Sequence, residues 1–212
     1  MSRKVLVAGA TGLVGSEILA KLAGDDIADA RALVRRPLDG AVLAPNVRQL
    51  VANFAALDAK PDWFRVDQVF CALGTTMRRA GSKEAFRRVD FDYPLAIARL
   101  ARAQGARHFL LVSAASADAS SRIFYSRVKG EIEDALRGLG FPALTIARPS
   151  ILLGPRKERR AGELVMKRIG FLLPAAFRPV EARQVASALV RAARVDTSGV
   201  TILDNIALRC ET

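Results

Sequence analysis

The run Val5-Leu6-Val7-Ala8-Gly9-Ala10-Thr11-Gly12-Leu13-Val14-Gly15 decides the fold, because an apolar strand ends there in a glycine-rich turn that opens a helix. The glycines are spaced G-x-x-G-x-x-G. In such a turn Gly9 permits the tight bend, Gly12 lets the backbone approach a pyrophosphate, and Gly15 lets the helix pack close to the sheet. The free N–H groups and the positive end of the helix dipole would face the phosphates. The pattern predicts a dinucleotide site, and an ordinary tight turn is the alternative.

The rest of the chain alternates apolar runs with helical stretches, as in βαβ units around a parallel sheet. Strands are expected at residues 5–8, 32–34, 47–51, 68–72, 108–112, 143–147 and 200–203. Helices are expected at residues 13–22, 94–104, 121–139 and 182–193. The order predicts an α/β fold, a Rossmann-type doubly wound parallel sheet in one domain over residues 1–212. Beyond Arg148-Pro149 the pattern is less regular, so roughly residues 150–180 are expected to form a small C-terminal cap on the substrate side.

The composition excludes several classes of protein. A chain of 212 residues with 51% hydrophobic and 25% charged residues is typical of a folded domain rather than a disordered one. No apolar run reaches the roughly 20 residues that a membrane span needs, and the first apolar stretch is too short for a signal peptide. Cys71 and Cys210 match no disulfide or metal spacing, so we expect a cytoplasmic protein without a metal site.

The net charge of +12, from 33 Lys and Arg against 21 Asp and Glu, leaves the partner open. Long runs of like charge, which mark a basic arm, are absent. The densest cluster is Arg156-Lys157-Glu158-Arg159-Arg160, and a glutamate interrupts it. A dispersed arginine-rich surface is therefore favoured over a nucleic-acid or membrane partner, and that cluster keeps no assigned role beyond attraction of an anionic substrate.

A second motif bears on the kind of dinucleotide. A site for NAD carries an Asp or Glu about 20 residues after the glycine turn, where it accepts the ribose 2′-OH. This chain has Arg35-Arg36-Pro37 after its second strand. Guanidinium groups bind a 2′-phosphate in bidentate fashion, whereas a carboxylate would repel it. We predict NADP(H) rather than NAD(H), with two ordinary surface arginines as the alternative.

The third motif is Tyr125-Ser126-Arg127-Val128-Lys129, a Y-x-x-x-K pattern on a predicted helix. Positions i and i+4 share one helical face, so the two functional side chains are neighbours. A cation beside a phenol favours the phenolate and makes the tyrosine a usable general acid or base. Many helices contain this pattern by chance, so it indicates chemistry only in combination with the glycine turn.

In that combination the chain resembles the short-chain dehydrogenase/reductase superfamily, in its extended or atypical branch. It is more closely similar to the Tat-interacting-protein type of NADP-binding protein, over most of residues 5–162. The stretches that carry this similarity are Cys71-Ala72-Leu73-Gly74-Thr75-Thr76, Arg88-Val89-Asp90-Phe91-Asp92-Tyr93, His108-Phe109, Tyr125 to Glu131, and Arg148-Pro149-Ser150-Ile151-Leu152-Leu153-Gly154-Pro155.

The resemblance implies roles for individual residues. Tyr125 would protonate a carbonyl oxygen as hydride arrives from the nicotinamide, and Lys129 would also hold the nicotinamide ribose. The loop from Ala72 would pack along the cofactor, Asn53 would lie near the adenine, and the Arg-Pro turn would pass the carboxamide. The expected cofactor-binding residues are Gly9, Thr11, Gly12, Leu13, Val14, Gly15, Arg35, Arg36, Asn53, Ala72, Leu73, Gly74, Thr75, Tyr125, Lys129, Arg148, Pro149, Ser150 and Ile151.

One departure from the family pattern leaves the activity open. The family often has two serines at the end of the fifth strand, one of which hydrogen-bonds the carbonyl, and this chain has Ser113-Ala114-Ala115-Ser116. Ser113 is the candidate, but if the catalytic hydroxyl belongs to the second position, Ala114 has replaced it, because a shift of one residue turns a strand side chain to the other face.

Two hypotheses follow. The first is an NADPH-dependent oxidoreductase that acts on a small carbonyl or related substrate. The second is a non-catalytic NADP(H)-binding regulatory or redox-sensing protein. The substrate and the oligomeric state stay open. Of the remaining polar residues, Glu131, Glu133 and Asp134 are expected on a solvated helical face, and the single histidine, His108, is expected to be structural.

Overall fold

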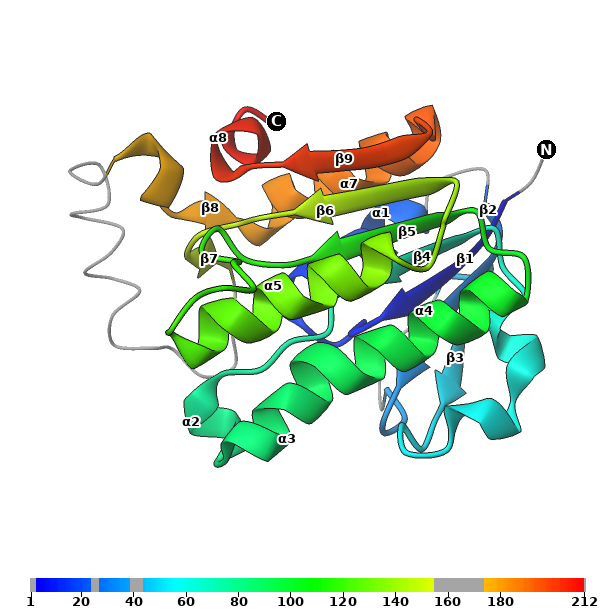
Figure 1. The fold of residues 1–212 in the computed structure, drawn as a ribbon. Coiled ribbons are helices and arrows are strands. Elements are labelled where there is room, and N and C mark those ends of the chain that lie inside the picture. Colours follow the sequence, from blue (N-terminus) through cyan, green and yellow to red (C-terminus); the bar gives the residue numbers. More distant parts are fainter. Residues whose placement is uncertain (1–2, 24–26, 39–43, 155–173, 212) are drawn as a thin grey trace.

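The computed structural model describes residues 3–23, 27–38, 44–154 and 174–211, and its centre is a seven-stranded sheet (Figure 1). The strand order is β3-β2-β1-β4-β5-β6-β9, and every neighbouring pair is parallel. The strands are β1 (Arg3–Ala8), β2 (Ile27–Val34), β3 (Val47–Val51), β4 (Gln68–Cys71), β5 (His108–Val112), β6 (Ala143–Ala147) and β9 (Gly199–Leu203). The predicted α/β fold with a doubly wound parallel sheet is confirmed.

Helices cover both faces of this sheet. In Figure 1, α4 (Tyr93–Ala103) and α5 (Phe124–Arg137) lie in front of it, and α1 (Leu13–Leu22) and α7 (Ala182–Val195) lie behind it. Side chains of β1 alternate between the two layers: Val5 and Val7 join the core under α1 and α7, and Leu6 joins the core under α4 and α5. Because both faces are covered at the centre of the sheet, β4, β5 and β6 are buried over their whole length, whereas the edge strands β3 and β9 are partly exposed.

The strand order creates a switch point at the carboxyl ends of β1 and β4, where open α/β sheets form a ligand crevice. After β1 the chain passes to β2 and β3, then returns to β4 on the other side of β1. In open α/β sheets ligands bind at such a switch point. The glycine turn, which connects β1 to α1, lies there.

Strand β2 begins five residues earlier than the predicted strand at 32–34, because a charged residue is accommodated inside it. Arg31 is 6% exposed. Its guanidinium donates to Asp29 Oδ2 and to the backbone carbonyls of Asp62 and Trp63, at 2.8 to 3.0 Å. A buried guanidinium is tolerated when its N–H groups are hydrogen-bonded in this way.

Several short elements were not predicted from the sequence. They are α2 (Met77–Ala80), α3 (Lys83–Arg87), the π-helical segment η3 (Arg88–Asp92), the 3-10 turn η1 (Leu57–Ala59) and α8 (Asn205–Arg209). Trp63 and Phe64, expected in a helix packed on the sheet, lie in the 3-10 turn η2 (Pro61–Phe64). Side-chain oxygens of Thr76 and Ser82 cap α2 and α3 by accepting from backbone N–H groups. Helix α5 begins at Phe124, three residues later than predicted.

The cap region is described only in part. Strands β7 (Leu152–Leu153) and β8 (Val180–Glu181) form a short parallel pair, and the 3-10 turn η5 (Ala175–Phe177) precedes β8. The basic cluster at residues 156–160 and most of the predicted cap lie outside the described residues. A single domain over residues 1–212 with a cap near 150–180 therefore stays a prediction.

Candidate active site

The glycine turn is held together by close backbone contacts. Gly9 has a φ of +82°, and a Cβ there would lie 2.5 Å from the carbonyl oxygen of Ala72, after β4. A Cβ on Gly15 would lie 2.1 Å from the carbonyl oxygen of Gly9. The tight turn predicted for Gly9 and the close helix packing predicted for Gly15 are both confirmed.

Gly12 forms the N-terminal boundary of α1. Its N–H donates to the carbonyl of Gly9 at 2.9 Å, and its side-chain position is exposed. The first N–H groups of α1, from Leu13 to Gly15, follow directly, and such groups lack partners within their own helix. These donors and the bare backbone of the turn can hold a pyrophosphate.

Helix α5 carries both residues of the Y-x-x-x-K motif at the opposite side of the crevice. Tyr125 is partly exposed, and its ring packs on the buried Phe86 of α3 with 5.6 Å between ring centroids. A Cβ on Gly130 would lie 2.0 Å from the backbone N of Ala119, so the segment before α5 lies directly against the helix. These contacts pack Tyr125 against α3 and hold α5 close to the segment that precedes it.

Lys129 is buried and forms an ion pair with Asp90, with 2.8 Å between Nζ and Oδ1. Burial alone would lower the pKa of Lys129, but the nearby Asp90, and to a lesser degree Tyr125 and Cys71, raise it above its usual range. A Cβ on Gly74 would come within 3.9 Å of Nζ, so the lysine lies beneath the loop that follows β4. This places the ammonium group next to the predicted cofactor loop.

A second buried charged group is Glu133, which was predicted to be exposed to solvent. Glu133, two turns after Tyr125, is 0% exposed instead of solvated. It accepts hydrogen bonds from Arg148 Nη2 at 2.5 Å and from Ser113 Oγ at 2.5 Å. The prediction of a solvated Glu133 was wrong because its partners come from the ends of β5 and β6, far away in sequence. The hydrogen bond to Glu133 holds the pKa of Arg148 above its usual range.

The expected catalytic role of Ser113 stays a prediction, and the geometry bears on it. Its hydroxyl is buried and donates to the Glu133 carboxylate. Ala114, next along the chain, is also buried and brings no hydroxyl. The carboxyl end of β5 therefore supplies a serine whose proton is already engaged by a protein group.

The other predicted cofactor residues follow the carboxyl ends of strands along this same edge. Arg35 and Arg36 are exposed after β2, and Asn53 is exposed after β3 with its Oδ1 accepting from Ala55 N at 3.0 Å. After β6, Ser150 N donates to Asn205 Oδ1 at 2.9 Å, and Ile151 is 40% exposed. The predicted cofactor residues thus lie on six chain segments, at 9–15, 35–36, 53, 72–75, 125–129 and 148–151, which follow the carboxyl ends of strands or belong to α5.

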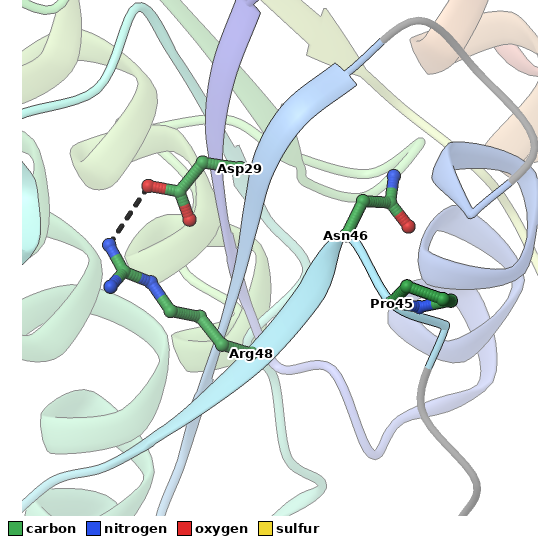
Figure 2. Close-up of a pocket in the computed structure, with 4 residues that line it drawn as sticks. All are labelled: Asp29, Pro45, Asn46 and Arg48. Carbon is green, nitrogen blue, oxygen red and sulfur yellow. Dashed lines mark hydrogen bonds and ion pairs between the residues drawn. The ribbon is translucent and has the colours of Figure 1, made fainter.

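A small pocket lies at the amino ends of the strands, away from the predicted cofactor residues. Asp29, Pro45, Asn46 and Arg48 line it, at the amino ends of β2 and β3 (Figure 2). Figure 2 shows Arg48 directed at Asp29, with 2.9 Å between Nη2 and Oδ2. Burial raises the pKa of Asp29, but hydrogen bonds and attraction from Arg31 and Arg48 lower it overall. These charges compensate one another, and the pocket lies across the sheet from the glycine turn.

The fold and the site define a class: a Rossmann-type NAD(P)H-binding domain. The chain belongs to a family described as NAD(P)H-binding, whose model matches residues 9–195. Protein HTATIP2 of Rattus norvegicus is 40% identical over 176 residues, which cover 82% of this chain and 72% of that protein. The mitochondrial protein FMP52 of Candida albicans is 33% identical over 204 residues, covering 91% of this chain and 89% of that protein.

Solved structures share the fold. The Bordetella bronchiseptica enzyme WbmH, in complex with NAD+, aligns with a TM-score of 0.73 at 16% identity, covering 95% of this chain and 75% of that one. The similarity to the Tat-interacting-protein type and the binding of a nicotinamide dinucleotide, both predicted from the sequence, are thereby confirmed at the level of the family.

Three observations concern the location of the protein and its further partners. No helix in the described ranges has the length and apolar character to cross a membrane. Within the same ranges, no three His, Cys, Asp or Glu side chains are grouped to hold a metal ion. Fungal relatives are named as mitochondrial proteins, so the cytoplasmic location stays a prediction, as does the absence of a nucleic-acid partner.

Two residues that matter in this site escaped the sequence interpretation, Asp90 and the buried Glu133. A usable signal existed for the second: Tyr125, Lys129 and Glu133 recur every four residues and form a polar stripe on a helix whose neighbouring positions are core. For Asp90 the sequence shows the motif Arg88-Val89-Asp90. No neighbouring residue indicates that Asp90 is buried while the nearby charged residues Arg88 and Asp92 are exposed.

Proposed function

We propose that this protein is an NADPH-dependent oxidoreductase that reduces a small carbonyl or related substrate, with Tyr125 as proton donor. The observation that carries this proposal is the pair on α5: a partly exposed tyrosine one helical turn from a buried, ion-paired lysine. The pair lies across the crevice from a glycine turn that fits a pyrophosphate.

When bound, NADPH supplies a hydride. Tyr125 then holds a proton at its phenol oxygen and donates it to the substrate oxygen, which gains charge as the hydride arrives. The ammonium of Lys129 stabilises the resulting phenolate and binds the nicotinamide ribose. Ser113 is the proposed partner of the substrate carbonyl, and its hydroxyl must then leave the Glu133 carboxylate to which it donates.

The proposed cofactor contacts follow the predicted set. The backbone of Gly9 to Gly15 holds the pyrophosphate, and the loop from Ala72 to Thr75 packs along the cofactor. The exposed Arg35 and Arg36 bind the 2′-phosphate, which is the reason to propose NADPH over NADH. Asn53 lies towards the adenine, and residues 148–151 towards the carboxamide.

A second function is favoured by a specific observation. Ala114 stands where the family often has a serine, and the hydroxyl of Ser113 is engaged by Glu133. A protein that binds NADP(H) without turnover, as a regulatory or redox-sensing module, is compatible with this arrangement. Tight NADPH binding without cofactor oxidation across a broad panel of aldehydes, ketones and quinones would favour it.

The experiment that tests the leading proposal replaces Tyr125→Phe. Turnover of any substrate found with the carbonyl panel should be abolished, while the Kd for NADPH should change by less than about threefold, because the phenol donates its proton only during the reaction. The matched control is Tyr93→Phe, at the other tyrosine of the chain, which packs on Phe54 in the core under α4. Turnover that survives Tyr125→Phe would contradict the mechanism.

A further inference from the structure

Asp90 is a buried carboxylate with two partners from different parts of the site. Its residue is 1% exposed. Oδ1 lies 2.8 Å from Lys129 Nζ, and Oδ2 accepts from the backbone N–H of Thr75 at 2.9 Å. A carboxylate in this position joins the helix that carries Tyr125 to the loop that follows β4.

The local backbone explains why this residue points inward. Asp90 lies in the π-helical segment η3, between α3 and α4. Single π-turns are rare and occur frequently at functional sites. Arg88 and Asp92 of the same segment are exposed, so among its three charged residues Asp90 alone is directed into the molecule.

The charges around Lys129 show what depends on Asp90. The groups that act on the ammonium are Asp90 from η3, Tyr125 from α5 and Cys71 from β4. Burial raises the pKa of the Cys71 thiol to about 12, so the thiol is neutral. Among the described groups that face Lys129, Asp90 is thus the one carboxylate. A buried lysine without a counter-ion loses its proton, in documented cases with a pKa near 5 to 6.

We propose that Asp90 is a positioning residue that keeps Lys129 protonated and aligned beneath the cofactor loop, so that the ammonium can bind the nicotinamide ribose. Because the Thr75 N–H donates to the same carboxylate, Asp90 positions both Lys129 and the loop that follows β4. This inference rests on the proposed function, since it assigns Lys129 a contact with the bound cofactor.

The test is Asp90→Asn, which keeps the size of the side chain and an oxygen that can accept from Thr75 N–H but removes the charge. The Kd for NADPH is measured by cofactor fluorescence from about pH 7 to about pH 9.5. In the variant the affinity should fall with rising pH, by up to about tenfold for each unit above the lowered pKa of Lys129. The wild-type affinity should stay nearly constant over this range.

Asp92→Asn is the matched control, because it makes the same change two residues away at an exposed position. It should follow the wild type. A purely structural role of Asp90 would weaken binding equally at every pH, so an Asp90→Asn curve parallel to the wild type would overturn the proposal.

A measurement on the wild-type protein covers the case in which the variant does not fold. The chain has seven lysines, so 13C-labelled lysine gives a small set of Cε resonances, and Lys129→Met identifies the one of interest. The Lys129 resonance should titrate above the usual range of lysine side chains. Titration at or below that usual range would overturn the inference. If wild-type NADPH binding itself is absent, the proposed function fails, and the lysine titration still decides the charge state of Lys129 separately.

Discussion

At the glycine turn the candidate site consists of backbone atoms, whereas beside α5 it consists of buried charged side chains. A Cβ on Gly9 or Gly15 would meet carbonyl oxygens at 2.5 and 2.1 Å. On the other side, Lys129 pairs with Asp90, and Glu133 binds Arg148 and Ser113. The backbone side should respond to added volume, and the side-chain side to removed charge. Substitutions on each side can therefore separate these two sensitivities.

The largest effect is expected from Gly15→Ala. The new methyl group would collide with the Gly9 carbonyl, so the turn must open, and we expect a loss of about 4 kcal/mol or more in the free energy of unfolding. Urea unfolding measures it. Gly138→Ala is the control, because its Cβ would meet Ala135 O at an ordinary 3.5 Å. Equal stability of the Gly15→Ala and Gly138→Ala proteins would contradict the close packing.

On the charged side, Glu133→Ala should cost about 3 kcal/mol, because it leaves the Arg148 guanidinium and the buried Ser113 hydroxyl without their acceptor. Asp134→Ala, next to it on α5, removes an exposed carboxylate paired with Arg137 and should cost less than about 1 kcal/mol. The difference between the two midpoints in urea is the measured quantity. If Glu133→Ala left the free energy of unfolding unchanged, the hydrogen bonds of Glu133 with Arg148 and Ser113 would contribute nothing to stability.

A smaller effect, confined to binding, is expected at Arg35 and Arg36. Their joint replacement by Ala should weaken NADPH binding by roughly tenfold to a hundredfold, which corresponds to one or two charged hydrogen bonds, and should leave NADH binding unchanged. Arg107→Ala, an exposed arginine at the opposite edge before β5, serves as the control. Calorimetric titration with both cofactors checks it, and equal losses for NADPH and NADH would rule out a 2′-phosphate contact.

The smallest effect concerns His108, whose ring nitrogens lie 2.8 Å from Asp196 Oδ1 and 2.9 Å from Thr145 Oγ1. Burial lowers the pKa of His108 more than the Asp196 carboxylate raises it, so the folded state favours the neutral ring. The unfolded chain binds the proton near pH 6.5. The contribution of His108 to the free energy of unfolding should therefore be constant above about pH 7 and decrease as the pH falls through about 6.5.

Urea unfolding at about pH 7.5 and about pH 5.5 tests this sign. Because the chain has one histidine, His108→Gln should remove the part of the slope that His108 contributes. Stability that increases on acidification would mean that pairing with Asp196, and not burial, dominates at this buried site.

The same contrast explains which features were predictable. The seven strands and the glycine turn depend on neighbouring residues, so apolar runs and the spacing of glycines indicated them directly. The start of β2 was missed because Arg31 is neutralised partly by carbonyls 31 and 32 residues away. Glu133 was placed in solvent because its partners Arg148 and Ser113 are 15 and 20 residues distant. A local pattern cannot show how a buried charge is compensated across the fold.

A crystal structure of the wild-type protein with NADPH tests most directly whether the cofactor lies between the glycine turn and Tyr125. The pyrophosphate should lie on the N–H groups after Gly12, the 2′-phosphate between Arg35 and Arg36, and the nicotinamide ribose within hydrogen-bonding reach of Lys129 Nζ, with the nicotinamide ring facing the Tyr125 hydroxyl. A nicotinamide bound away from Tyr125 and Lys129 would contradict this placement.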